Sequence, residues 1–257
     1  MQITDGFVST DHGRIHFLEA GSGPAIILLH TNGNSAYEYE DMLNILGQRF
    51  RVIAWDQPGH GDSDCVTRHY SVEDFSDALA CFMEALGLKT ASVLGSSIGG
   101  AIATDFGARY GDKIDTLFIC EAPVRTQEVW KGNWSNTEKN YGMASQTMAQ
   151  IENRLNHVDE EFLTRWNVDR NKAGSWTMTQ VMWALRQYDM EGAMAKITCK
   201  PVVVVGGKSG VKAAEPIYRK LIDGMSFELM ENSGHFPMLD EPDVLSEIVV
   251  KHIDAKA

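Results

Sequence analysis

Short apolar runs bounded by turn residues recur along this 257-residue chain and predict strands. The first two runs flank the turn sequence Asp11-His12-Gly13 and are expected to pair antiparallel. Most of the later runs are almost continuously apolar, which is typical of strands buried on both faces of a sheet. The predicted strands are Gly6–Thr10, Arg14–Ala20, Ala25–His30, Arg51–Trp55, Thr90–Gly95, Ile114–Cys120, Pro201–Gly206 and Ser226–Glu231.

Helical patterns lie between these runs. After Ser71, a candidate N-cap, apolar residues recur on one helical face as far as a stop signal at Gly87. A second pattern, Ile98–Gly111, follows a predicted strand directly. Alternation of strands and helices predicts an α/β fold, in which a mostly parallel sheet is covered by helices on both faces.

One segment, residues 124–195, breaks this alternation because it contains no strand-like apolar run. Helical spacing fits it throughout, and it holds five of the six tryptophans of the chain. We therefore predict a helical lid, inserted into a core that is formed by residues 1–123 and 196–257.

The composition of the chain limits the classes of partner that it can bind. The formal net charge of −12 argues against nucleic acid and anionic membranes. The first residues carry no signal-peptide pattern, and no run reaches the ~20 apolar residues that span a bilayer. We expect a cytoplasmic protein with a small-molecule partner and reduced cysteines, and a homodimer is left open. The cysteines, which match no metal or redox motif, are Cys65, Cys81, Cys120 and Cys199.

The sequence Gly95-Ser96-Ser97-Ile98-Gly99 is a G-x-S-x-G pattern with a predicted strand before it and a helix after it. This context places Ser97 in a tight turn, where its glycine neighbours avoid a Cβ clash. The start of the helix directs N–H groups toward charge that develops on a substrate oxygen. Ser97 is the candidate nucleophile, and a chance Gly/Ser-rich turn is the alternative.

A late histidine, His235, stands in the loop after the last strand, where a Ser…acid…His order needs its base. His30 and His60 are its rivals. Loops after the third strand supply one backbone N–H to an oxyanion hole, which we assign to Asn32, and Ile98 supplies the other. An ordinary Asn-Gly turn at Asn32 is compatible with this role.

The glycine-rich loop Asp56–Asp64 offers His60, Asp62 and Asp64 as conceivable metal ligands. Its glycine pattern fits a structural loop better, so we predict no metal site and no organic cofactor.

Four segments in order resemble the α/β-hydrolase superfamily over nearly the whole chain: LLHTNG, WDQPGHGDSD, GSSIGG and SGHFPMLDEP. The resemblance implies an eight-stranded sheet, a lid after the sixth strand and a Ser–acid–His triad. A serine at position 97 argues against haloalkane dehalogenases, whose nucleophile is an aspartate.

The superfamily pattern would place the acid of the triad at about Ser209 or Gly210. This chain has no carboxylate there. Glu121 ends the sixth strand, which is expected beside the nucleophile's strand, and the carboxyl ends of both strands face one crevice. We assign the acid to Glu121; a solvated strand-end carboxylate is the alternative reading of this residue. The other candidate acids are Glu215, Asp240 and Glu241.

A subset of the superfamily carries its acid after the sixth strand. The Cys120-Glu121 pair, the surroundings of His235 and the Trp183-Ala184 pair are similar to fungal zearalenone lactone hydrolases, whereas the two glycine-rich loops look more like general esterases. These resemblances imply hydrolysis of an ester or a lactone.

The lid composition favours an uncharged, hydrophobic and aromatic substrate, because Trp and Met offer large apolar surfaces. Substrate contacts are predicted from Trp183, Trp134, Met143 and Pro123; the alternative is that the lid tryptophans and methionines form the lid's own core. Three other functions stay open: a meta-cleavage C–C hydrolase, a cofactor-free haloperoxidase or perhydrolase, and a non-catalytic binding protein with this fold.

Overall fold

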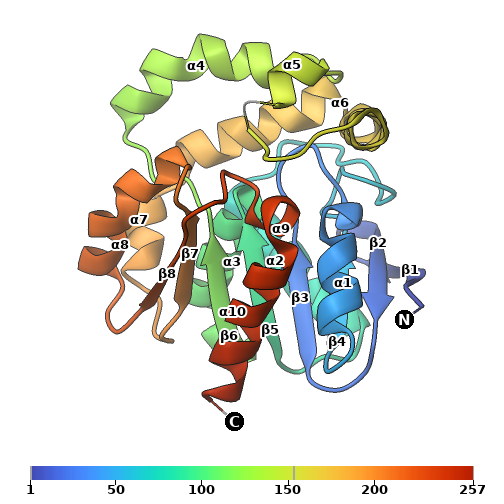
Figure 1. Ribbon diagram of the computed structural model, residues 1–257, viewed down its shortest axis with the longest axis vertical. Helices are drawn as coiled ribbons and strands as arrows, with labels where there is room; N and C mark the ends of the chain where they lie inside the picture. Colours follow the sequence, from blue (N-terminus) through green and yellow to red (C-terminus); the bar gives the residue numbers. More distant parts are fainter. Residues whose placement is uncertain (1, 153, 257) are drawn as a thin grey trace.

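The computed structural model describes residues 2–152 and 154–256. Its centre is an eight-stranded sheet with the order β1-β2-β4-β3-β5-β6-β7-β8 (Figure 1). The β1–β2 and β2–β4 pairs are antiparallel, and every other neighbouring pair is parallel. The strands are β1 (Thr4–Thr10), β2 (Gly13–Ala20), β3 (Ala25–Leu29), β4 (Arg51–Trp55), β5 (Ala91–Ser96), β6 (Ile114–Cys120), β7 (Val202–Gly206) and β8 (Ser226–Met230).

Helices cover both faces of this sheet. They are α1 (Glu40–Leu46), α2 (Val72–Ala85), α3 (Ile98–Arg109), α4 (Gln127–Tyr141), α5 (Met148–Ile151), α6 (Glu160–Gln187), α7 (Met190–Met194), α8 (Glu215–Leu221), α9 (Pro237–Asp240) and α10 (Pro242–Asp254). Short 3-10 turns are η1 (Ala36–Tyr39), η2 (Gly111–Lys113) and η3 (Gly210–Ala214).

Alternation along the strands divides the core into two layers. Ile27 and Leu29 of β3 pack with α2 and α3 on one face, while Ile26 and Leu28 pack with α1 and α10 on the other. Successive strand residues point to opposite faces, so both must be apolar when helices cover both sides. The predicted mostly parallel sheet with helices on both faces is confirmed, and its strands lie within two residues of the predicted bounds.

Local signals account for the helix ends. Ser71 caps α2 by accepting the N–H of Asp74, and the Asp74 side chain accepts the N–H of Ser71, which completes a capping box. Gly87 follows this helix with a positive φ of 69°. The four cysteines are free.

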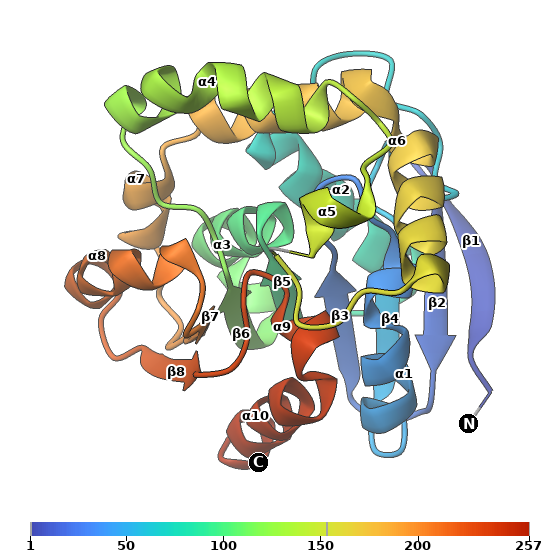
Figure 2. The ribbon, with the colours of Figure 1, turned by 45° about the horizontal axis from the view of Figure 1, so that its top comes forward.

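The segment 124–195, which we call the cap, leaves the sheet after β6 and returns at β7. It folds into α4, α5, α6 and α7, and α4, α5 and α6 lie together over one end of the sheet (Figures 1 and 2). The long helix α6 is kinked at Gly174, where φ is 74° and ψ is 157°. Two polar contacts tie α6 to the core: Lys172 Nζ lies 2.6 Å from Asp62 Oδ1, and Asn32 Nδ2 donates to Met178 O at 2.9 Å. Within the described chain, no helix is long and apolar enough to cross a membrane.

Candidate active site

Ser97 occupies the sharp turn between β5 and α3. Its φ of 57° and ψ of −112° lie in a region that L-residues other than glycine rarely adopt. The turn is closed tightly, since a Cβ on Gly95 would lie 1.9 Å from Gly99 O and one on Gly99 would lie 2.2 Å from Leu29 O. The glycines around Ser97 are therefore a steric requirement of the turn.

Glu121 and His235 are brought together at the carboxyl end of the sheet. The imidazole Nδ1 of His235 lies 2.7 Å from Glu121 Oε2. Glu121 is fully buried, whereas 29% of the His235 side chain is exposed. A buried carboxylate at Nδ1 fixes the ring orientation and leaves Nε2 as the free nitrogen of the imidazole.

The loop after β7 supplies donors to this carboxylate instead of an acid. Gly206 N–H donates to Glu121 Oε1 at 2.7 Å, and the Ser209 hydroxyl donates to Glu121 Oε2 at 2.5 Å. Glu121 itself has a positive φ of 50°, which carries its side chain from the end of β6 toward the β7 loop. Ser209, where the superfamily pattern expects the acid, thus contacts the carboxylate that comes from the neighbouring strand.

Ser97 and His235 line one cavity of about 990 Å³ between the sheet and the cap. Within the described part of the chain, no hydrogen bond joins the Ser97 hydroxyl to the imidazole. Such contacts are often long in unliganded enzymes and shorten when substrate binds.

Two backbone N–H groups were predicted as oxyanion donors. Among the described residues, the N–H groups of Asn32 and Ile98 donate no hydrogen bond, although both residues are buried. The Ile98 N–H is free because it belongs to the first turn of α3, which has no preceding carbonyl to bind. Neither Asn32 nor Ile98 is among the residues that line the cavity, so their role as oxyanion donors stays a prediction.

The Asn32 side chain is held from two sides. Its Nδ2 donates to Met178 O of the cap, and its Oδ1 lies 3.2 Å from His60 Nε2. Burial, together with the nearby His30, lowers the pKa of His60 to about 3, so this ring is neutral, and its Nδ1 lies 3.3 Å from Pro58 O. His30 is also kept neutral, since burial lowers its pKa and its Nε2 accepts the N–H of Gln57. Neither rival histidine lines the cavity.

A buried carboxylate that the sequence did not single out lies beneath the same loop. Glu38 accepts hydrogen bonds from the Thr31 N–H at 2.7 Å, from the Thr31 hydroxyl at 2.7 Å and from Asn34 Nδ2 at 2.5 Å. Burial raises the pKa of Glu38 from 4.5 to about 7; the hydrogen bonds oppose the rise and the Asp169 charge adds to it. Glu38 thus binds Thr31 and Asn34, which stand before and after Asn32 in the loop.

This shift predicts a pH-dependent stability. Because the folded pKa lies above the unfolded one, the protonated folded state is favoured, and stability falls as pH rises from about 4.5 to about 7. We expect the unfolding free energy of Glu38→Gln, relative to wild type, to rise by about 2 kcal/mol between pH 5 and pH 8. Urea unfolding of both proteins at the two pH values measures this, because the comparison cancels all other titrations. A difference that is constant with pH would contradict it.

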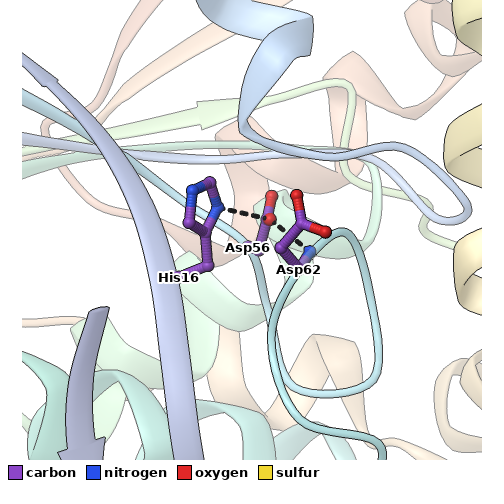
Figure 3. A group of neighbouring side chains, drawn as sticks. All are labelled: His16, Asp56 and Asp62. Atoms are coloured by element: carbon purple, nitrogen blue, oxygen red, sulfur yellow. Dashed lines mark hydrogen bonds and ion pairs between the residues drawn. The ribbon is translucent and has the colours of Figure 1, made fainter. Parts of the chain in front are cut away.

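The glycine-rich loop after β4 forms a hydrogen-bonded network with β2, and the acidic and histidine side chains that it brings together are His16, Asp56 and Asp62, not the set His60, Asp62 and Asp64 considered from sequence. Figure 3 shows His16 and Asp62 on either side of Asp56, which accepts His16 Nδ1 at 2.7 Å and the Asp62 N–H at 2.8 Å through Oδ2. Its Oδ1 accepts the Ala36 N–H at 2.6 Å. The Asp62 carboxylate binds Lys172 of the cap. These contacts use the oxygens of both carboxylates to hold loops together.

The other candidate acids make no hydrogen bond to the imidazole among the described residues and have partners of their own. Glu215 pairs with Arg219 in α8. Asp240 accepts the N–H groups of Gly234 and Asn156, and Glu241 accepts the Ser233 hydroxyl. Asp240 and Glu241 therefore brace the loop that carries His235.

Of the four residues predicted to contact substrate, Pro123 lines the cavity and the other three do not. Trp134 and Trp183 pack against each other with ring centroids 4.2 Å apart, and Met143 is 52% exposed. The prediction is corrected here: these two tryptophans belong to the cap's own packing, which was the stated alternative.

The apolar wall of the cavity comes from neighbouring positions of the same helices, chiefly Trp130 of α4 and Met182 and Leu185 of α6. Consecutive helical residues point about 100° apart, so a shift of one position moves a side chain from the cavity to the cap interior. The sequence indicates which helices surround the site, and packing of α6 against α4, α2 and α3 decides which face turns toward the cavity.

The chain belongs to a known family. Residues 24–242 match the model of the alpha/beta hydrolase fold, a family of hydrolytic enzymes. A relative from Mesorhizobium japonicum, 2-(acetamidomethylene)succinate hydrolase, is 33% identical over 272 residues, which cover 98% of this chain and 97% of the relative. A soluble epoxide hydrolase from a Corynebacterium strain is 23% identical, and the match covers 93% of each chain. The structure of the enol-lactonase from Burkholderia xenovorans has a TM-score of 0.82 at 19% identity, with 97% of this chain and 100% of the other covered, which shows a shared fold.

Proposed function

We propose that this protein is a serine hydrolase that cleaves a carboxylic ester or lactone through an acyl-enzyme. The proposal is carried by one observation: the turn serine and an imidazole lie on the wall of one cavity, and that imidazole contacts a buried carboxylate at 2.7 Å. Ser97 is the nucleophile, His235 the general base and Glu121 the group that orients it.

The chemistry follows from these roles. His235 accepts the Ser97 proton at Nε2 while the serine oxygen attacks the substrate carbonyl carbon, and Glu121 stabilises the imidazolium that forms. The oxyanion accepts the N–H groups of Asn32 and Ile98, each worth about 3 kcal/mol in such sites. His235 then protonates the leaving alkoxide, and a water activated by the same ring releases the acid.

The apolar side chains in the cavity wall favour a substrate that has an apolar portion. Trp130, Met182 and Leu185 support an aromatic or alkyl group beside the cleaved bond. A zearalenone-type lactone is the particular candidate suggested by the residues around Glu121 and His235. The lactonase named among the similar structures, and the succinate-derived substrate in the name of the 33% identical relative, agree with acyl transfer to water.

A fluorophosphonate probe combined with a substrate panel tests this function. The panel holds aliphatic and aromatic 4-nitrophenyl esters, aromatic lactones, an epoxide and a vinylogous 1,5-diketone. We expect a covalent adduct on Ser97, identified by peptide mass spectrometry, and turnover of an ester or lactone. Turnover of the diketone alone would assign C–C bond hydrolysis instead, and absence of both adduct and turnover would indicate a binding protein.

A further inference from the structure

Two arginines, Arg125 and Arg154, lie in the wall of the active-site cavity. Arg154 lies in the cap segment after α5, and Arg125 lies between β6 and α4. Among the described residues, neither guanidinium lies within ion-pair distance of a carboxylate.

Aromatic rings hold these guanidinium groups instead. The Arg154 guanidinium carbon is 4.9 Å from the centroid of Phe236, the residue after His235, and 5.8 Å from that of Trp166. The Arg125 guanidinium carbon is 4.9 Å from the centroid of Trp130. Stacking uses the face of a guanidinium, so the N–H groups along its edge stay free to bind a planar anion.

Most other stacked arginines of this protein differ in this respect. Those that pair with an aspartate or glutamate while stacking on a ring are Arg14, Arg49, Arg68, Arg109, Arg165 and Arg219. Arg170 is satisfied by the backbone carbonyls of Asn140, Met143 and Ala144. Arg186 stacks on Trp134 and Trp183 and pairs with no acid of the described residues, but it does not line the cavity.

The charge of the cavity is opposite to that of the protein. Its wall carries four cationic side chains, Arg125, Lys139, Arg154 and Lys208, and two carboxylates, Glu152 and Asp240. This leaves an excess of 4 − 2 = 2 positive charges in the cavity of a chain whose net charge is −12. An excess of cationic side chains in a concave site raises the local concentration of anions.

Arg154 is also tied to the catalytic loop. Its carbonyl oxygen lies 3.1 Å from the point that a Cβ on Gly234 would occupy. Asn156, two residues further on, donates its N–H to Asp240 Oδ1, while Gly234 donates to Oδ2 of the same carboxylate. The arginine is therefore held close to the loop that presents His235.

We propose that Arg154, together with Arg125, binds a carboxylate of the substrate, so that the preferred ester or lactone carries a free carboxylate besides the bond that is cleaved. This inference rests on the proposed function and replaces the expectation of an uncharged substrate, including a zearalenone-type lactone, which carries no free carboxylate. Arg154 is a specificity-determining residue in this scheme. A planar carboxylate fits the edge of a guanidinium bidentately.

Hydrolysis of two matched esters tests the specificity: 4-nitrophenyl hydrogen adipate, which carries a free carboxylate, and methyl 4-nitrophenyl adipate, which does not. We expect wild type to prefer the charged ester by about tenfold or more in kcat/KM at low salt. Arg154→Met should lower kcat/KM for the charged ester by about 10- to 100-fold, and for the methyl ester by at most about threefold. Arg186→Met, the matched stacked arginine outside the cavity, should leave both values unchanged. Equal losses on both esters in Arg154→Met, or a wild-type preference for the methyl ester, would overturn the proposal.

Ligand binding separates this inference from the proposed function. Calorimetry with adipate on Ser97→Ala needs no turnover, and we expect binding that weakens at least about tenfold in Ser97→Ala/Arg154→Met. Adipate binding without ester turnover would retain the carboxylate site and reject the ester hydrolase. Ester turnover without any dependence on Arg154 would do the reverse. Tighter binding of inorganic phosphate than of adipate would overturn the assignment to a carboxylate. Arg154→Gln, which keeps part of the side-chain stem, serves if the methionine variant does not fold by circular dichroism.

Discussion

Replacement of Ser97 by alanine is expected to lower kcat for the best ester or lactone by about five orders of magnitude or more. The hydroxyl is the only group at the turn that can form the acyl-enzyme in the proposed mechanism, so its loss leaves only binding and the oxyanion hole. Steady-state kinetics measures the effect, and the fluorophosphonate adduct should disappear. Ser96→Ala is the matched control, because this neighbouring hydroxyl is buried in β5 and should change kcat by no more than a few-fold. Retained turnover, or an adduct on another residue, would exclude Ser97 as the nucleophile.

The same position reports on backbone strain. Alanine keeps the unfavourable φ of 57°, whereas glycine adopts it freely. We therefore expect Ser97→Gly to be more stable than Ser97→Ala by about 1 kcal/mol or more in urea unfolding, because strained φ/ψ angles cost about 1–3 kcal/mol. Equal stability of the two variants would mean that the turn is relaxed.

The core of the fold was predictable because the buried strands are short and apolar on both faces. β3 and β7 are buried at every position, as are the last residues of β4 and β6, since two covering layers of helices favour apolar residues on both faces. The position of Glu121 beside the nucleophile's strand also followed from topology alone, because β6 pairs with β5 and Ser97 N–H donates to Cys120 O.

The cap residues were less predictable for a geometric reason. Met182 and Trp183 have the same composition signal, and only their angle around the axis of α6 distinguishes cavity wall from cap interior. Trp130 and Trp134 share one face of α4 and differ in their position along it. Both differences are set by packing of α6 on α4, α2 and α3, which no local pattern encodes.

The electrostatic features of the site depend on contacts between distant segments. Glu38 lies in a 3-10 turn without periodicity, and its role becomes visible only when its three donors are seen around it. Arg154 is an ordinary arginine in sequence; its rings, Trp166 and Phe236, lie 12 and 82 residues further along the chain. Both groups could be recognised as exceptional only once their partners, or the absence of acidic partners in the described chain, were known.

The second prediction with a large expected effect concerns Glu121, the acid of the proposed triad. Glu121→Gln is expected to lower kcat by about 10³- to 10⁴-fold, because a neutral amide can neither hold the His235 Nδ1–H tautomer nor stabilise the imidazolium. The amide oxygen can still accept the Gly206 N–H, so the fold should persist. Kinetics of the purified variant, with circular dichroism as the folding control, measures this. Full activity of Glu121→Gln would show that the carboxylate is structural.

Ser209 allows a rescue that separates loss of charge from loss of structure. Its hydroxyl lies 2.5 Å from Glu121 Oε2, so an aspartate at position 209 can bring a carboxylate close to the point that Oε2 now occupies. We expect Glu121→Ala/Ser209→Asp to recover about tenfold or more of the kcat lost in Glu121→Ala, since the restored anion again faces His235 Nδ1. Ser209→Asn in the same background is the uncharged control and should recover nothing. If both double variants had the same kcat, the imidazole would not depend on a charge at this point. The role of Glu121 would then be structural.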